Sequence, residues 1–340
     1  MRPTPTTSNS VLSALTVLST AVATACSVVV PPPPNPGPEG PEPTPLPAIL
    51  DQPATVAEAE EIFGYDTSVP LDVQIESEFQ IRDVKVEDLT FASPMGGRVP
   101  ALLWKPAAGE GPFPAIVGMH GMPGDRHQMR ETGEAYAAAG AIVIGISGPA
   151  GRPDGTRRYV TFETPRDSLE QVQLIVDIRR AVDLLESRSD VDPDRIVFIG
   201  GSYGGAVGGL VAGVEHRFQA FVLMTGDGGV VTHFVTGGAT DRLPPADRER
   251  WLAAMAPIEP IRFVGLAAPR PLLFQNANFD RFVTREDATR YQQAGSEPKK
   301  IRWYDTGHGL EGFVIREAAE WLEPILGIDL ERFEFPPPPP

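Results

Sequence analysis

The sequence predicts an α/β fold: a mostly parallel sheet with helices on both faces and an antiparallel start. Short apolar runs bounded by turn residues, typical of buried parallel strands, alternate with helical patterns along most of the chain. Ahead of them, two segments of alternating polarity at 84–91 and 98–105 flank a turn sequence at 94–97, which predicts an antiparallel pair. The expected buried strands are 115–119, 141–146, 196–199, 220–224, 272–274 and 301–304, and the expected helices are 129–139, 167–187, 203–214 and 310–326.

The composition predicts how the chain is divided. Its 340 residues, 41% apolar and 22% charged, suffice for one large α/β domain or two small ones. Ten of the seventeen residues at 31–47 are proline, which favours extended polyproline II and cannot pack a core. We therefore expect a signal peptide at 1–25, a linker at 26–50 and a folded catalytic domain at 51–335. The net charge of −16 argues against nucleic-acid binding, because the phosphate backbone requires a basic face.

The N-terminal segment is typical of an export signal. Arg2 precedes an apolar run at 11–23 that is too short to span a bilayer. The sequence Ala23-Thr24-Ala25-Cys26 then resembles the lipobox of bacterial lipoproteins, in which cleavage leaves the cysteine as a lipid-carrying N-terminus; Ala23 departs from it, since leucine is preferred there. The resemblance implies export to the cell envelope and a lipid anchor at Cys26. Plain secretion and an uncleaved anchor are the alternatives.

Cys26 is the only cysteine of the sequence. No intramolecular disulfide and no cysteine cluster for a structural metal can therefore form. Contact with a membrane is expected through the N-terminal lipid only, and no oligomeric state is predicted.

A strand at 196–199 runs directly into the pattern G-x-S-x-G at 200–204. A serine at such a strand-to-helix turn has a strained backbone, and the glycines let strand and helix approach closely, so that the hydroxyl is exposed. Ser202 is therefore the predicted nucleophile. The N–H of Tyr203, at the helix N-terminus, is expected to stabilise negative charge on a carbonyl oxygen under attack. A nucleotide-binding turn would be similar, but this one lacks G-x-G-x-x-G and the P-loop lysine.

Histidine is the expected general base, because its intrinsic pKa lies near neutral pH. His308 directly follows the last apolar strand and has glycine on both sides, which lets the loop reach across the sheet edge. The other histidines, His120, His127, His216 and His233, lie in contexts that do not favour this role.

The third catalytic residue should be a carboxylate after the preceding strand, where it can fix the tautomer of the histidine and stabilise the imidazolium. Asp280 follows the apolar run at 272–274 and meets this expectation. Glu286 and Asp287 compete with it. They follow a helix start, where acidic residues are more simply partners of the helix dipole.

The chain order Ser202, Asp280, His308 resembles that of the α/β hydrolases, and the likeness extends over about 84–326. The stretch 191–195, Val-Asp-Pro-Asp-Arg, before the Gly-Gly-Ser-Tyr-Gly-Gly turn resembles the group that joins acetyl-xylan-esterase-like, dienelactone-hydrolase-like and prolyl-oligopeptidase-like enzymes. Dienelactone hydrolases proper carry cysteine at the turn. Prolyl-oligopeptidase-like peptidases carry a large N-terminal propeller, for which 48–83 is too short. Both departures favour a simple esterase.

The resemblance implies a serine esterase that acts through an acyl-enzyme on a small-molecule or polymer-borne ester, without metal or organic cofactor. It also implies that Met122, which follows His120-Gly121, contributes the second backbone N–H of the oxyanion hole. The alternative for this loop is a tight turn without catalytic role. A peptidase or amidase would use the same triad. An inactive tethered binding protein is disfavoured, because all three residues are intact.

The segment 226–265 is too long for one simple connection between strands. Insertions at this place in the α/β hydrolases often cover the active site, which implies that Phe234, Trp251 and Leu252 contact substrate. The alternative is an ordinary packing helix at 247–255, because an aromatic residue at helical spacing is more often part of a core.

Overall fold

The computed structural model describes residues 44–155 and 157–335. The predicted signal peptide, Cys26 and most of the proline-rich linker lie outside these residues. Within the described part, packing begins before the expected boundary at residue 51. The N–H of Thr44 donates to Asp241 (2.9 Å), and Leu50 is buried. No helix in the described ranges has both the length and the apolar character needed to cross a membrane.

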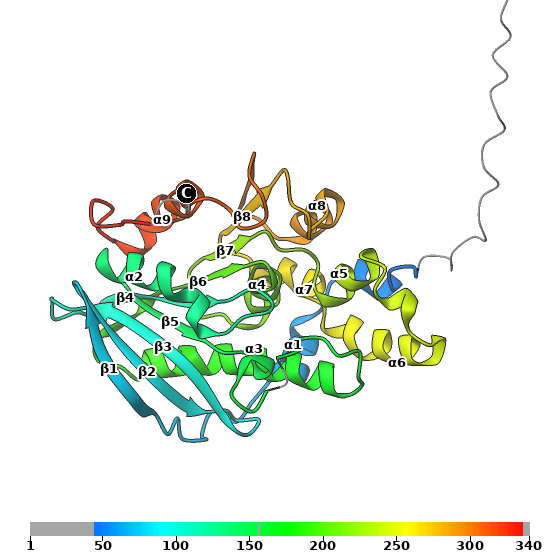
Figure 1. Cartoon of the computed structure of the whole chain (residues 1–340), viewed down its shortest axis with the longest axis horizontal. Coiled ribbons are helices and arrows are strands. Elements are labelled where there is room, and N and C mark those ends of the chain that lie inside the picture. Colours follow the sequence, from blue (N-terminus) through cyan, green and yellow to red (C-terminus); the bar gives the residue numbers. More distant parts are fainter. Residues whose placement is uncertain (1–43, 156, 336–340) are drawn as a thin grey trace, which may run out of the picture. The chain divides into compact units, whose positions relative to one another are not determined.

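The sheet begins with an antiparallel part, as the sequence predicts (Figure 1). Strand β1 (Gln74–Ile81) pairs with β2 (Val84–Ala92), which pairs in turn with β3 (Arg98–Pro106). The turn between β2 and β3 lies at the predicted residues. Strand β1 was not among the strands expected from the sequence. Its Ile75, Phe79 and Ile81 alternate with polar residues, but seven of its eight residues are exposed, so it has no buried apolar run.

The rest of the sheet is parallel and forms the predicted centre of the fold. Strand β3 lies antiparallel to β5, and from there the order is β5, β4, β6, β7, β8, β9 with all neighbours parallel. The strands are β4 (Phe113–Met119), β5 (Ile142–Ile146), β6 (Val191–Gly201), β7 (Phe221–Met224), β8 (Leu272–Ala277) and β9 (Lys299–Tyr304).

Helices cover both faces of the inner part of this sheet, so strands such as β4, β5, β7 and β8 are apolar on both sides, whereas the edge strand β9 has no buried residue. Alternate residues face opposite layers: Val117 packs with one hydrophobic cluster and its neighbour Ile116 with the other. Helices α2 (Arg130–Ala138) and α9 (Gly312–Leu326) lie on one face, and α1 (Val56–Phe63), α3 (Arg166–Glu186) and α4 (Tyr203–Val214) on the other (Figure 1).

The connection from β7 to β8 holds three α-helices: α5 (Val230–Thr236), α6 (Pro245–Met255) and α7 (Pro260–Phe263). Helix α8 (Arg285–Ala294) connects β8 to β9. The 3-10 helices are η1 (Ala48–Asp51), η2 (Arg126–Met129), η3 (Pro149–Gly151), η4 (Thr240–Arg242), η5 (Ala256–Ile258) and η6 (Val264–Ala267).

Candidate active site

Ser202 lies in the turn between β6 and α4 and has φ 57° and ψ −120°, a backbone conformation that side-chain-bearing residues rarely adopt. Its N–H donates to the carbonyl of Met224 (2.9 Å), which ties the turn to β7. The close approach that this turn requires explains the two glycines of the motif. A Cβ at Gly200 would lie 2.2 Å from the carbonyl oxygen of Gly204, and one at Gly204 would lie 2.2 Å from that of Met119.

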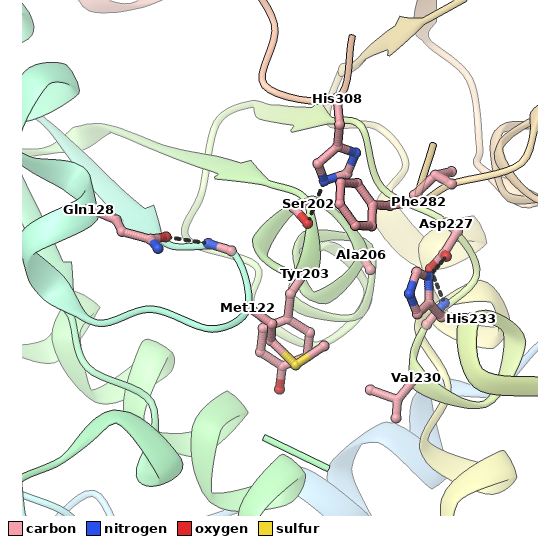
Figure 2. A pocket seen from close by; sticks show the side chains of 13 residues that line it. Met122, Gln128, Ser202, Tyr203, Ala206, Asp227, Val230, His233, Phe282 and His308 are labelled. Carbon is pink, nitrogen blue, oxygen red and sulfur yellow. Dashed lines mark hydrogen bonds and ion pairs between the residues drawn. The ribbon is translucent and has the colours of Figure 1, made fainter. Parts of the chain in front are cut away.

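His308 lies in the loop between β9 and α9, and its imidazole joins the two other predicted residues. Nε2 is 2.8 Å from Oγ of Ser202, and Nδ1 is 2.7 Å from Oδ2 of Asp280. The ring of Phe282 packs against the imidazole with centroids 5.0 Å apart. The structure therefore brings the three residues of the predicted triad together in one series of hydrogen bonds. Figure 2 shows the part of this series that joins His308 to Ser202.

Asp280 follows β8, and its side chain is only 5% exposed. Burial by itself would raise the pKa of this carboxyl. The hydrogen bonds from His308 and from the N–H groups of Val283 and Phe282 outweigh burial, so the pKa of Asp280 lies below its usual value. The carboxylate is therefore held in its ionised form, which favours the proton on Nδ1 of His308.

The two competing acidic residues lie in the first turn of α8, as their helix-start context indicates. Thr284 caps this helix: its hydroxyl accepts from the N–H of Asp287 (3.0 Å) and donates to the Asp287 carboxylate (2.7 Å). Asp287 thus takes part in the cap of α8 and also accepts from the Thr236 hydroxyl of α5 (3.3 Å). Glu286 belongs to the same first turn of α8, where an acidic side chain is a favourable partner of the helix dipole.

Met122 and Tyr203, the predicted backbone donors, both line the pocket at Ser202 (Figure 2). Tyr203 is the first residue of α4, and the first N–H groups of a helix have no partner within it. In the neighbouring loop, the N–H of Gly121 is directed at Oε1 of Gln128 (3.2 Å). This contact holds the loop just before Met122.

Buried His120 supports the same loop through contacts of both ring nitrogens. Its Nδ1 is 2.8 Å from the carbonyl oxygen of Gly121, and its Nε2 is 3.3 Å from the N–H of Gly148. Burial lowers the pKa of His120, which favours the neutral ring that both contacts require. His120 is therefore a structural support of the predicted oxyanion loop, whereas His216 is exposed in the turn between α4 and β7.

A pocket of about 280 Å³ opens beside Ser202. Residues of the 226–265 segment form part of the pocket wall, as expected of a cap. The lining does not include Phe234, Trp251 or Leu252, the three residues that the sequence singled out. Val230 and His233 of α5 line the pocket. Trp251 is fully buried, and its indole N–H donates to Asp167 (2.8 Å), so α6 is a packing helix at this point.

The same pocket contains a second histidine–aspartate pair that sequence reasoning missed. Nδ1 of His233 is 2.9 Å from Oδ2 of Asp227, and both residues line the cavity. The available signal was the position of Asp227, shortly after the carboxyl end of β7, since ligands bind at this edge of open α/β sheets. The position of His233 in the pocket could not be predicted from the sequence, because it depends on how α5 packs.

Comparison with known proteins agrees with the fold. Residues 65–225 match the model of the acetyl xylan esterase family. No curated protein matches the sequence significantly. Among solved structures, the acetyl xylan esterase of a Paenibacillus species is 18% identical, with a TM-score of 0.65 over 83% of this chain and 100% of that one.

Two further solved structures have the same fold. The acetyl xylan esterase of a Thermoanaerobacterium species is 19% identical, with a TM-score of 0.65 over 86% of this chain and 96% of that one. A glucuronoyl esterase of Solibacter usitatus is 17% identical, with a TM-score of 0.57 over 82% and 97%. Together with the mostly parallel sheet, its antiparallel start and the serine turn after β6, these likenesses show that the chain has the α/β-hydrolase fold.

Proposed function

We propose that the protein is a serine carboxylesterase, a hydrolase that cleaves ester bonds through a covalent acyl-enzyme. One observation carries the proposal: the continuous series of hydrogen bonds from Oγ of Ser202 through the imidazole of His308 to Asp280, beside a pocket. A histidine in this position can take the serine proton while the carboxylate fixes its tautomer and stabilises its charge. The assigned roles are nucleophile for Ser202, general base for His308 and orienting acid for Asp280.

The reaction has two balanced halves. Oγ of Ser202 attacks the ester carbonyl carbon while Nε2 of His308 accepts the hydroxyl proton, and the N–H groups of Met122 and Tyr203 stabilise the resulting oxyanion. The carbon–oxygen bond to the alcohol then breaks, and His308 gives its proton to the departing oxygen. Water attacks the acyl-enzyme in the same way, which releases the acid and restores Ser202.

The match to the acetyl xylan esterase family model supports an ester substrate rather than an amide. The modest pocket volume supports a short acyl group. The ester is carried by a small molecule or by a polymer such as an acylated polysaccharide.

Hydrolysis of p-nitrophenyl acetate, butyrate and octanoate, beside peptide p-nitroanilides, tests the proposal. We expect turnover of the short esters that falls by about a thousandfold or more in Ser202→Ala. Rates that do not depend on Ser202 would refute the nucleophile. Cleavage of the anilides alone would instead identify a peptidase or amidase.

We also propose that the protein is exported and lipid-anchored through Cys26 to a bacterial membrane. The support is the lipobox-like sequence at 23–26 and the proline-rich segment after it, which would act as a spacer. Cell fractionation of the full chain and of Cys26→Ser is the test. The variant should leave the membrane fraction; recovery of both forms in the soluble fraction would contradict lipid anchoring.

A further inference from the structure

The pair formed by Asp227 and His233 is a second built polar feature of the pocket, separate from the triad. The side chain of Asp227 is only 6% exposed, whereas that of His233 is 33% exposed and lines the cavity. His308 already occupies the position next to the Ser202 hydroxyl. The bond-breaking steps therefore leave His233 without a role.

The orientation of His233 is fixed by its partner. Oδ1 of Asp227 accepts the N–H of Gly229 (3.1 Å), and Oδ2 lies 2.9 Å from Nδ1 of His233. A carboxylate at this distance makes Nδ1 the protonated nitrogen. The other ring nitrogen, Nε2, points toward the cavity (Figure 2).

The helix that carries His233 is anchored below the pocket. Glu259 is fully buried and accepts the N–H groups of Val231 (2.8 Å) and Thr232 (3.1 Å) at the start of α5. An immobilised helix and a buried carboxylate partner hold the imidazole in one position, which is what a recognition group requires.

Carboxylates on the surrounding elements favour a charged His233. The hydrogen bond that His233 donates to Asp227 raises the pKa of His233, burial opposes it, and the charges of Asp227, Asp287 and Asp280 add to the increase. The Glu259 carboxyl lies at the start of the same helix, where it accepts the N–H groups of Val231 and Thr232. In its charged form His233 carries a proton on Nε2 as well, so that it offers an N–H donor to the pocket.

The place of His233 in the pocket assigns it to one side of the substrate. His308 must return its proton to the departing alcohol, so the alcohol lies on the His308 side of Ser202. In Figure 2, His308 lies above Ser202, whereas Val230 and His233 lie below it and to the right. An acyl group bound on the side of Ser202 away from the leaving alcohol would lie against the wall formed by α5.

We propose that His233 is a specificity residue, whose Nε2–H donates a hydrogen bond to an oxygen carried by the acyl group of the substrate. The proposal rests on the proposed esterase function and narrows its substrate class to short acyl groups that bear a hydroxyl or a carboxylate. Both groups offer an oxygen that can accept this hydrogen bond, neutral in the hydroxyl and charged in the carboxylate. Val230 and Ala206 provide apolar contacts for the carbon chain beside it.

Three p-nitrophenyl esters of equal acyl length test this: butyrate, 3-hydroxybutyrate and hemisuccinate. In the wild-type protein, kcat/KM for an oxygen-bearing ester should exceed that for butyrate by about 10-fold for a neutral acceptor and up to about 100-fold for an anion. A preference for 3-hydroxybutyrate alone identifies a neutral acceptor, and one for hemisuccinate an anionic acyl group. Equal values for all three esters would overturn the proposal.

Variants at position 233 test whether His233 causes the preference for oxygen-bearing acyl groups. His233→Leu should abolish the preference, whereas His233→Gln, which keeps an N–H donor, should restore part of it. His216→Leu is the matched control at an exposed histidine and should keep the wild-type ratio. Active sites are titrated with an organophosphonate that reacts with Ser202, so that misfolded protein does not enter the rates. A preference that survives His233→Leu would overturn the assignment.

Two further readouts separate the possible failures. The ratio of hemisuccinate to butyrate hydrolysis should fall as the pH rises through the raised pKa of His233, and His233→Gln should lack this fall. Acetate esters of alcohols with and without hydroxyl groups form the second set; if His233→Leu changes selectivity only there, the acyl-side placement is wrong. Ser202-dependent hydrolysis without acyl preference refutes this inference alone, whereas rates independent of Ser202 refute the proposed function as well.

Discussion

Two histidine–aspartate pairs face the same pocket and have nearly the same internal geometry. The Nδ1-to-carboxylate distance is 2.7 Å for His308 and Asp280 and 2.9 Å for His233 and Asp227. Both carboxylates are almost fully buried, at 5% and 6% exposure. What differs is the group that the second ring nitrogen faces, the serine hydroxyl for His308 and the cavity for His233.

The difference teaches that a buried carboxylate with a histidine is not by itself a sign of a catalytic base. The loop after β9 extends His308 to the serine turn, whereas α5 fixes His233 to the pocket wall. Whether such a histidine acts as a base or recognises substrate therefore depends on its position relative to Ser202. Four predictions test how different the two pairs are.

Replacing each histidine with glutamine should give the largest contrast. His308→Gln removes the group that accepts the serine proton, so kcat/KM for p-nitrophenyl acetate should fall by about a thousandfold or more. His233→Gln should lower it by less than about tenfold, because this residue does not touch Ser202. Steady-state rates per titrated active site provide the measurement. Equal losses in the two variants would mean that both histidines take part in bond breaking.

Replacing the aspartates should give the next contrast. Asp280→Asn removes the charge that stabilises the imidazolium of His308 and favours the wrong tautomer, so kcat should fall by about 10²–10⁴-fold. Asp227→Asn should mainly reduce the preference for oxygen-bearing acyl groups, by about tenfold. The two kcat values, measured on one acetate ester, decide between equivalent and distinct pairs.

Replacing a glycine at the start of α5 and a glycine beside His308 with alanine should affect stability to different extents. Gly229, at the start of α5, has φ +127°, and a Cβ there would lie 2.4 Å from Pro260 and 2.7 Å from the Glu259 carboxylate. Gly229→Ala should therefore lower the free energy of unfolding by roughly 2–4 kcal/mol. A Cβ at Gly307, beside His308, would meet open space, and Gly307→Ala should cost about 1 kcal/mol or less. Urea unfolding of both variants is the measurement.

The pH dependence of stability should have opposite signs in the two regions. Burial raises the pKa of Glu259 from its usual 4.5 to about 8. Its stabilising contribution is then complete below pH 4.5 and is lost as the pH rises toward 8. The pKa of Asp280 lies below its usual value, so its contribution is present above that value and is lost as the pH falls through the folded-state pKa.

Urea unfolding at pH 4.5 and pH 8 can detect whether the contribution of Glu259 to stability is lost as the pH rises. Relative to the wild type, Glu259→Gln should gain roughly 1–2 kcal/mol of unfolding free energy between the two pH values, because glutamine has no charge to bury. His233→Gln should change in the same direction by no more than about 1 kcal/mol, since the pair is partly exposed. A wild-type curve that rises toward pH 8 in step with Glu259→Gln would contradict the raised pKa.

The sequence predicted the inner strands most clearly. Strands β4 to β8 appear as apolar runs because helices cover both sides of the sheet there, whereas the edge strand β9 was predicted although none of its residues is buried. Strand β1 and helix α1 lacked a strong signal. Helix α1 has only eight residues, and the one sequence signal for it is the reciprocal capping of Thr55 and Glu58 at its N-terminus.

The site was predictable where a residue directly follows a strand. Ser202, Asp280 and His308 each come shortly after β6, β8 and β9, so their chain positions alone bring them to one edge of the sheet. The second pair was not predictable in this way. His233 reaches the pocket only through the packing of α5, which Glu259 anchors across a gap of more than twenty residues in sequence.

The placement of His233 on α5 has a consequence for how such a protein can change over evolution. The connection from β7 to β8 forms this wall of the pocket, whereas the three triad residues come from other connections. Exchanges at the positions of α5 that line the pocket can thus change which acyl groups fit, because no triad residue lies in this connection. Substrate range in this scaffold is therefore free to diverge faster than mechanism.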